Sequence, residues 1–169
     1  MTTEQPTTPW AFLADAMLGR LARWLRILGY DTAYDKTLTD DLLIERAQRE
    51  GRWLLTRDRY LARRKVLRGR HTLITNDSIN DQLRQLRHDL NLSLDPSEER
   101  PLRCAKCNVL VMPVSSREAG PLVPQYVAQH YNHFAQCPRC LHVYWPGTHW
   151  EAMVARLAAI GQEDRNLPR

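Results

Sequence analysis

The chain has 169 residues, of which 43% are hydrophobic and 25% charged, with a formal net charge of +5 and a pI of about 9.3. This length suits one ordinary domain, or a medium domain with a small module, and the composition excludes a disordered or fibrous chain. No apolar run reaches the roughly 18 residues of a membrane span, and the first ten residues lack the basic and apolar regions of a signal peptide. We therefore expect a cytoplasmic protein with no membrane segment and a disordered tail over residues 1–10, whose modest positive charge suits an anionic partner.

Residues 11–92 alternate between short apolar runs and helical patterns. The apolar runs are AFLAD (11–15), YDTAYD (30–35), WLLT (53–56) and HTLIT (71–75), and helical patterns follow at 17–29, 39–51, 57–69 and 77–90. This rhythm predicts an α/β fold in which helices cover both faces of a parallel sheet, because strands buried on both sides are apolar throughout. In the first helix, Arg20, Arg23 and Arg26 lie opposite the apolar stripe.

The composition changes after residue 92. Polar residues and two prolines predict a linker over residues 93–103. Residues 104–157 then form a second unit of short, irregular elements that ends in a helix beginning at 148, and residues 158–169 are expected to be a C-terminal tail.

Four cysteines form the pattern CxxC…CxxC in the second unit: Cys104, Cys107, Cys137 and Cys140. Two thiolates that are two residues apart can chelate one ion from a tight turn, and two such turns complete a tetrahedral Zn²⁺ site. Ligation by sulfur alone leaves no open position on the metal, so we expect the zinc to be structural. The alternative is a redox pair or four unrelated buried cysteines.

Acidic residues follow the predicted strands and begin one of the predicted helices. Asp15 ends the first strand, Asp58 follows the third and Asp77 follows the fourth, while Asp40 and Asp41 begin the second helix. Ligands of such sheets bind beyond the carboxyl ends of the strands. Carboxylates gathered there repel one another unless a cation such as Mg²⁺ or Mn²⁺ neutralises them. Each acid could instead serve only as a helix cap or a turn residue.

Basic residues surround Asp58. Arg57 and Arg59 flank it, and the segment from Arg52 to Arg70 holds eight basic residues against Asp58 alone. A metal ion held by the carboxylates would activate water for attack on a phosphodiester, and these arginines would attract the phosphate backbone. The alternative is that this segment is only a solvated helix face.

Several longer stretches, taken in order, resemble the Mut7-C RNase domain family. They are FLADAMLGRLARWLRILGYDTAYD, DDLLIERAQREGRWLLTRDR, the two CxxC motifs and YWPGTHWEAM. The resemblance runs from Phe12 to Leu157, and the family pairs a PIN-like domain with a C-terminal zinc ribbon. It implies an α/β fold with a PIN-like parallel sheet flanked by helices, followed by a small zinc-ribbon module.

The resemblance also implies a metal-dependent ribonuclease. Matched to this sequence, it makes Asp15, Asp40 and Asp58 the catalytic ligands of Mg²⁺ or Mn²⁺, and it makes the four cysteines the zinc ligands. Asp41 is a less favoured neighbour of Asp40, and Asp77 is a secondary candidate placed only by its position after a strand.

The leading hypothesis is therefore a hydrolase that cleaves RNA. Arg20, Arg23, Arg57 and Arg59 would contact the phosphates, and the ribbon would assist RNA binding. A second hypothesis is a non-catalytic adaptor that binds RNA or the ribosome through the ribbon and the basic charge, and a third is a protein-interaction module. A homodimer is also a candidate state, because PIN-like domains often pair.

Overall fold

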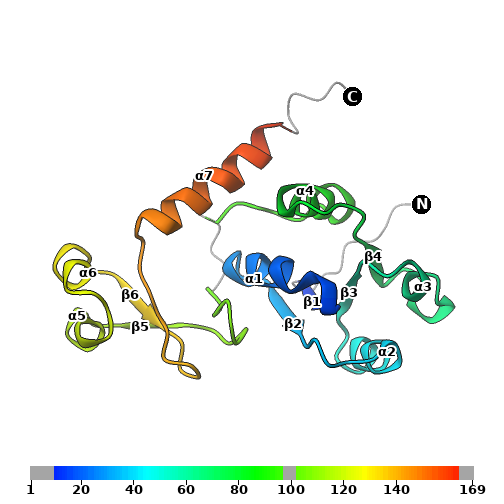
Figure 1. The fold of residues 1–169 in the computed structure, drawn as a ribbon, viewed down its shortest axis with the longest axis horizontal. Coiled ribbons are helices and arrows are strands. Elements are labelled where there is room, and N and C mark those ends of the chain that lie inside the picture. Colours follow the sequence, from blue (N-terminus) through cyan, green and yellow to red (C-terminus); the bar gives the residue numbers. More distant parts are fainter. Residues whose placement is uncertain (1–9, 97–101, 164–169) are drawn as a thin grey trace.

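The computed structural model describes residues 10–96 and 102–163. The predicted tail at residues 1–9 lies outside the described residues, as do residues 97–101 of the predicted linker and residues 164–169 at the C-terminus. Figure 1 shows an elongated molecule, with a sheet and its helices at one end and a smaller unit of short strands at the other. No helix among the described residues is both long enough and apolar enough to cross a membrane.

The first unit is built on a parallel sheet of four strands in the order β2-β1-β3-β4. The strands are β1 (Ala11–Ala14), β2 (Asp31–Tyr34), β3 (Trp53–Thr56) and β4 (His71–Leu73). Because β2 and β3 flank β1 on opposite sides, the direction of the chain across the sheet reverses at β1. The crevice between the carboxyl ends of β1 and β3 is thus the topological switch point, the usual binding place in such sheets.

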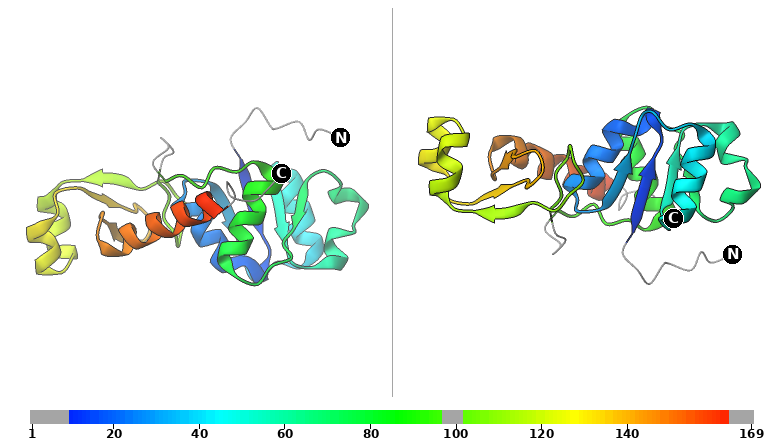
Figure 2. Two further views of the ribbon diagram at one scale, coloured as in Figure 1. Left: turned by 90° about the horizontal axis from the view of Figure 1, so that it is seen from above. Right: turned by 90° about the horizontal axis from the view of Figure 1, so that it is seen from below.

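Helices cover both faces of this sheet, as the sequence predicts (Figure 2). The helical segments are η1 (Ala16–Leu18), α1 (Gly19–Ile27), α2 (Asp40–Arg49), α3 (Arg59–Ala62), η2 (Lys65–Leu67) and α4 (Ile79–Leu90), where η marks a 3₁₀ turn. Side chains alternate along a strand, so Phe12 and Ala14 pack against α1 and α4, whereas Leu13 packs against α2 and α3.

The predicted helix over residues 57–69 is replaced by two short pieces. The α3 helix ends at Ala62, the backbone is extended at Arg64, and the 3₁₀ turn η2 follows. Only Leu61 and Leu67 of this segment are fully buried. Two apolar anchors give a continuous helix little tertiary packing, which is the main source of helix stability in proteins.

The second unit contains a three-stranded antiparallel sheet in the order β5-β6-β7. Its elements are β5 (Met112–Val114), α5 (Ser116–Ala119), η3 (Gly120–Leu122), α6 (Gln125–His130), β6 (Phe134–Gln136) and β7 (Val143–Tyr144). Its buried apolar cluster consists of only Ala119, Val127, Phe134 and Val143. A core this small needs another source of stability, and bound metal commonly supplies it.

The last helix, α7 (Thr148–Glu163), runs back from the second unit to the first (Figure 1). Its Leu157 and Ile160 are buried in the cluster that α1 and α4 form. Residues 158–163 are therefore helical rather than part of a C-terminal tail, because Ile160 fills a place in the core. At the other end of the chain, Trp10 is also packed: its ring stacks on Phe12 with the centroids 5.6 Å apart.

Candidate active site and metal centre

Asp15 lies at the topological switch point, where its side chain ties β1 to β3. Its side chain is buried, with 5% of the residue exposed. Oδ2 accepts hydrogen bonds from the Thr56 hydroxyl at 2.6 Å and from the Arg57 N–H at 2.7 Å, and Oδ1 accepts one from the Met17 N–H at 2.8 Å. Burial of a carboxylate is costly unless such donors satisfy it, so this network fixes the position of the acid.

Asp58 is joined to Asp15 through Thr56. The Thr56 hydroxyl donates to Asp15 and accepts from the Asp58 N–H at 2.9 Å. The Asp58 carboxylate caps α3: its Oδ1 accepts from the N–H groups of Tyr60 and Leu61 at 2.6 and 3.0 Å. Thr56 is not among the site residues predicted from the sequence, although a hydroxyl residue at the end of an apolar strand is the signal that could have identified it.

The other predicted acids are exposed. Asp40 is the first residue of α2, whose N-cap is Thr39, and its carboxylate has no partner within the described part of the chain. Asp41 forms an ion pair with Arg64, and Asp77 forms one with Arg57. These pairs account for Asp41 and Asp77 without a metal.

Asp35 is an acid at this edge that sequence reasoning missed. It follows β2 directly and accepts hydrogen bonds from the Thr37 hydroxyl at 2.6 Å and the Thr37 N–H at 2.9 Å. These two bonds, the hydroxyl first, lower the pKa of Asp35 below its usual value. Its place after a predicted strand, the same signal that selected Asp15, would have identified it.

The acids are not gathered into one cluster of ligand atoms. Within residues 10–96 and 102–163, the four cysteines are the only set of three or more His, Cys, Asp or Glu side chains that comes close enough to share a metal ion. The acidic edge nevertheless keeps free coordination capacity. A carboxylate has about four lone-pair sites, and Asp58 Oδ2 and both oxygens of Asp40 accept no hydrogen bond from the described residues.

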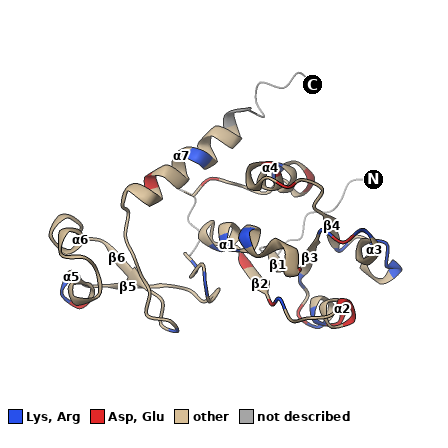
Figure 3. Cartoon of the chain, viewed as in Figure 1, with Lys and Arg blue, Asp and Glu red and all other residues tan. Residues whose placement is uncertain are grey.

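The basic residues predicted to contact phosphate differ in their availability. Arg20, Arg23 and Arg59 are exposed and form no ion pair with the described residues, while Arg57 is paired with Asp77. Figure 3 shows basic segments along α1 and around α3.

Arg26 does not belong to the exposed basic face of α1. It is 5% exposed, and its guanidinium donates to the carbonyl oxygens of Thr32 at 2.8 Å, Ala105 at 3.0 Å and Lys106 at 3.1 Å. Burial lowers the pKa of Arg26 below its ordinary value. The second unit covers this face of α1. The helical period of apolar residues could not indicate that burial, because the covering residues lie far along the chain.

The four cysteine sulfurs lie within 4.8 Å of one another. The sulfurs of Cys104 and Cys140 are 3.7 Å apart, and a tetrahedron with Zn–S bonds of about 2.3 Å has edges of about 3.8 Å. The cluster therefore has the size and the donor set of a structural zinc site.

Each CxxC motif forms the same tight turn. The N–H of Cys107 points at the sulfur of Cys104, and the N–H of Cys140 at the sulfur of Cys137, both at 3.4 Å. The turns end at Asn108 and Leu141, whose φ values are 64° and 60°. This matched pair of turns presents two sulfurs each to one point, which a redox pair would not require.

Hydrogen bonds prepare Cys104 to act as a thiolate. Burial acts to raise its pKa, but the Tyr144 hydroxyl, 3.2 Å from the sulfur, and the N–H groups of Cys107 and Lys106 outweigh burial and lower the pKa to about 6. For Cys107, burial and its cysteine neighbours raise the pKa to about 12.

The first cysteine turn is attached to the edge strand β2. The Asn108 side chain accepts a hydrogen bond from the Thr32 N–H at 2.9 Å and donates to Asp31 at 2.7 Å. Asp31 is also paired with Arg52 at 2.7 Å. Arg52 therefore has a structural role, although it belongs to the basic segment that was predicted from the sequence to attract phosphate.

These features define a class of protein: an α/β unit with acids at the carboxyl edge of a parallel sheet, joined to a four-cysteine module compatible with a zinc ribbon. The family model of the Mut7-C RNAse domain matches residues 10–157, and the chain belongs to this family. The match spans both units, which confirms the resemblance found in the sequence. No curated protein and no solved structure matches the chain significantly.

Proposed function

We propose that the protein is a metal-dependent ribonuclease that hydrolyses RNA phosphodiester bonds at the carboxyl edge of its parallel sheet. The observation that carries the proposal is Asp15, a buried carboxylate held by Thr56 and the Arg57 N–H at the topological switch point. The family supports a nuclease-type function, and the reducing cytoplasm suits a chain that needs four free thiols.

Asp15, Asp40 and Asp58 would hold Mg²⁺ or Mn²⁺, since carboxylate oxygens are the ligands that these ions prefer. When bound, the ion would lower the pKa of a water molecule and offset charge on the phosphate. Asp15 is fixed in place, whereas Asp40 is exposed and has no partner among the described residues, so it would turn toward the ion.

The arginines of the edge would position the RNA. Arg59, Arg20 and Arg23 are exposed and available for phosphates, and Arg57 would exchange its contact with Asp77 for one with the substrate. The zinc ribbon would assist binding through its own basic residues. This assignment predicts RNA affinity that falls steeply with salt, because phosphate contacts release counterions.

The test is cleavage of labelled single-stranded and structured RNAs by zinc-loaded protein, in buffers with and without Mg²⁺ or Mn²⁺. Omitting the ion is better than adding a chelator, which would also remove zinc. Asp15→Asn and Asp58→Asn are compared with Asp89→Asn, a control near the far end of α4. We expect both edge variants to lose at least about a hundredfold in rate, the scale of the loss of a transition-state contact, while the control keeps its rate.

Zinc content and thermal midpoint are measured for each variant, because Asp15 also has structural partners. Full cleavage by Asp15→Asn would refute the mechanism. Salt-sensitive binding without cleavage, unaffected by either edge variant, would instead favour the non-catalytic RNA- or ribosome-binding adaptor.

A further inference from the structure

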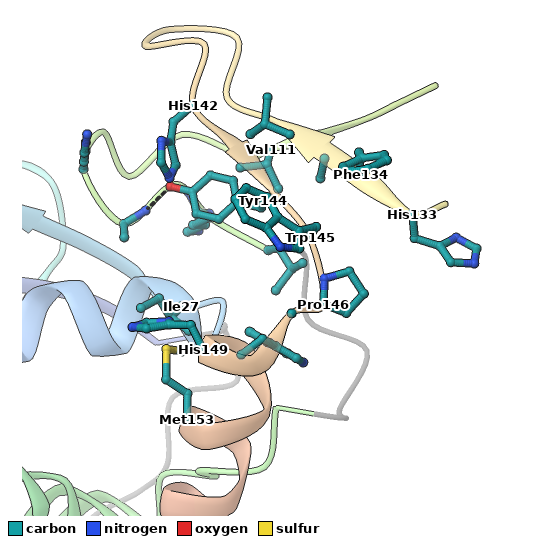
Figure 4. A pocket seen from close by; sticks show the side chains of 18 of the residues that line it. Ile27, Val111, His133, Phe134, His142, Tyr144, Trp145, Pro146, His149 and Met153 are labelled. Atoms are coloured by element: carbon teal, nitrogen blue, oxygen red, sulfur yellow. Dashed lines mark hydrogen bonds between the residues drawn. The ribbon is translucent and has the colours of Figure 1, made fainter. Parts of the chain in front are cut away.

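A cavity of about 670 Å³ lies between the zinc ribbon and the two helices α1 and α7. Figure 4 shows Tyr144 and Trp145 on the ribbon side of this cavity, across from Ile27, His149 and Met153 of the helices. A volume of this size is in the range of small-molecule sites, and such sites are mostly apolar with a few polar groups. The cavity is far along α1 from Asp15, so it is separate from the proposed active site.

The aromatic wall of the cavity is preorganised, because contacts within the protein hold its side chains in place. The Tyr144 hydroxyl donates to the Cys104 sulfur at 3.2 Å and accepts from the Ala105 N–H at 3.1 Å. The Trp145 indole packs on the ribbon core and lies so close to Gly147 that an added Cβ there would be 2.7 Å from its Nε1. Phe134 of the ribbon core also lines the cavity, whereas Trp150, another aromatic lining residue, belongs to none of the apolar clusters of the described residues.

The charged side chains that line the cavity are basic. Its lining includes Arg103 and Lys106 but no Asp or Glu. Arg103 also donates to the carbonyl oxygens of Gly29 and Asn108 and lies 3.9 Å from Asp31, so the exposed Lys106 is the cation that a ligand would meet first. Residues 102–150 as a whole carry four basic side chains, Arg103, Lys106, Arg117 and Arg139, against Glu118 and the four cysteines, whose thiolates a bound Zn²⁺ would neutralise only in part. Aromatic rings combined with cationic residues are the surface that binds single-stranded nucleic acid, because every base has a face that can stack.

Helix α1 connects this cavity to the acidic edge. It begins beside Asp15, and its Arg20, Arg23 and Ile27 lie within about 60° of one another around the helix axis. Ile27 lines the cavity, and the two arginines are exposed and have no ion-pair partner among the described residues. The row spans about 10 Å along the axis, so one strand could extend from the edge to the cavity.

We propose that this cavity binds an unpaired nucleobase of the RNA strand whose phosphates follow Arg20 and Arg23 to the acidic edge. The proposal rests on the proposed function, since it names the single-stranded character of that substrate. A paired base cannot enter, because its face is covered by its neighbours in the helix. The ribbon thereby selects unpaired RNA at a fixed distance from the site of cleavage.

The test measures binding by zinc-loaded protein without Mg²⁺ or Mn²⁺, so that no cleavage occurs. Fluorescence anisotropy compares a labelled twelve-nucleotide RNA of mixed sequence with an abasic strand of the same length, at one salt concentration. We expect the strand with bases to bind at least about fivefold more tightly, the lower end of the effect of one stacked base. Trp150→Ala and His149→Ala should remove this advantage while leaving the affinity for the abasic strand unchanged.

Tyr126→Ala is the matched control, because Tyr126 is an exposed aromatic residue of the ribbon that does not line the cavity. It should keep the preference for bases. Equal affinity for the two strands, or a preference that survives in both cavity variants, would overturn the proposal. If the protein cleaves RNA but shows no preference for strands with bases, the base-binding role of the cavity is refuted and the nuclease function stands. If Trp150→Ala loses a base preference that the parent shows, but the parent does not cleave RNA, the nuclease function is refuted and base binding stands.

Discussion

Replacing Arg26 by methionine should destabilise the protein substantially, although the sequence groups it with two exposed arginines. The guanidinium makes three hydrogen bonds to carbonyl oxygens at 2.8–3.1 Å, one within the first unit and two to the first cysteine turn. Hydrogen bonds from a charged group contribute about 1.5–3 kcal/mol each. The cost of burying the cation offsets part of that gain, so we expect a net loss of about 3 kcal/mol.

The assay is thermal unfolding of zinc-loaded protein, with zinc release to a chromogenic chelator as a second readout. For a chain of this length each kcal/mol corresponds to about 2–4 °C in Tm, so the midpoint should fall by about 6–12 °C. Zinc should also leave faster, because Arg26 holds the Ala105 and Lys106 carbonyls between Cys104 and Cys107. Arg26→Lys should show an intermediate loss, since an ammonium group cannot reproduce the planar fork.

The control is Arg23→Met, an equivalent change one turn earlier on α1 at an exposed position. A surface change of this kind usually stays within about 0.5 kcal/mol. Equal midpoints for the two methionine variants would refute the reasoning. Unchanged zinc release from Arg26→Met would mean that the contact does not connect the units.

Two further predictions concern Asp31, which helps to connect the two units, and the cysteine cluster of the second unit. Burial acts to raise the pKa of Asp31, but hydrogen bonds from Arg52 and Asn108 outweigh burial and hold the pKa below its usual 3.8. This carboxylate therefore stabilises the fold above about pH 4, and the contribution is lost as the pH falls through the lowered pKa. In urea unfolding, Asp31→Asn should be less stable than the parent by roughly 1 kcal/mol at pH 7. This difference in the free energy of unfolding should narrow below pH 4, and a difference that stays constant with pH would contradict the role of the Asp31 carboxylate. Cys137→Ser should abolish stoichiometric zinc binding and unfold the ribbon. Hydrogen exchange should then show lost amide protection in β5–β7, while the β1–β4 sheet stays protected. Full zinc content in this variant would exclude the four-sulfur site.

The local pattern of the sequence was sufficient for the main elements and for the cluster of four cysteines. WLLT predicts β3 without error, since a strand buried on both faces is apolar at every position. The CxxC pairs predict their cluster because a two-residue spacing suffices to form each turn. Asp15 and Asp58 fall at the sheet edge because strand ends of a parallel sheet share one side.

Tertiary structure alone decided the features that depend on segments far apart in the chain. Arg26 has the same local pattern as Arg23, yet it is buried because residues 105 and 106 cover it. The role of Thr56 depends on the pairing of β1 with β3, and α7 continues to Glu163 because the cluster of α1 and α4 receives Ile160. Periodicity reports only which face of an element is apolar, whereas burial of a polar group depends on which distant segment supplies its hydrogen-bond partners.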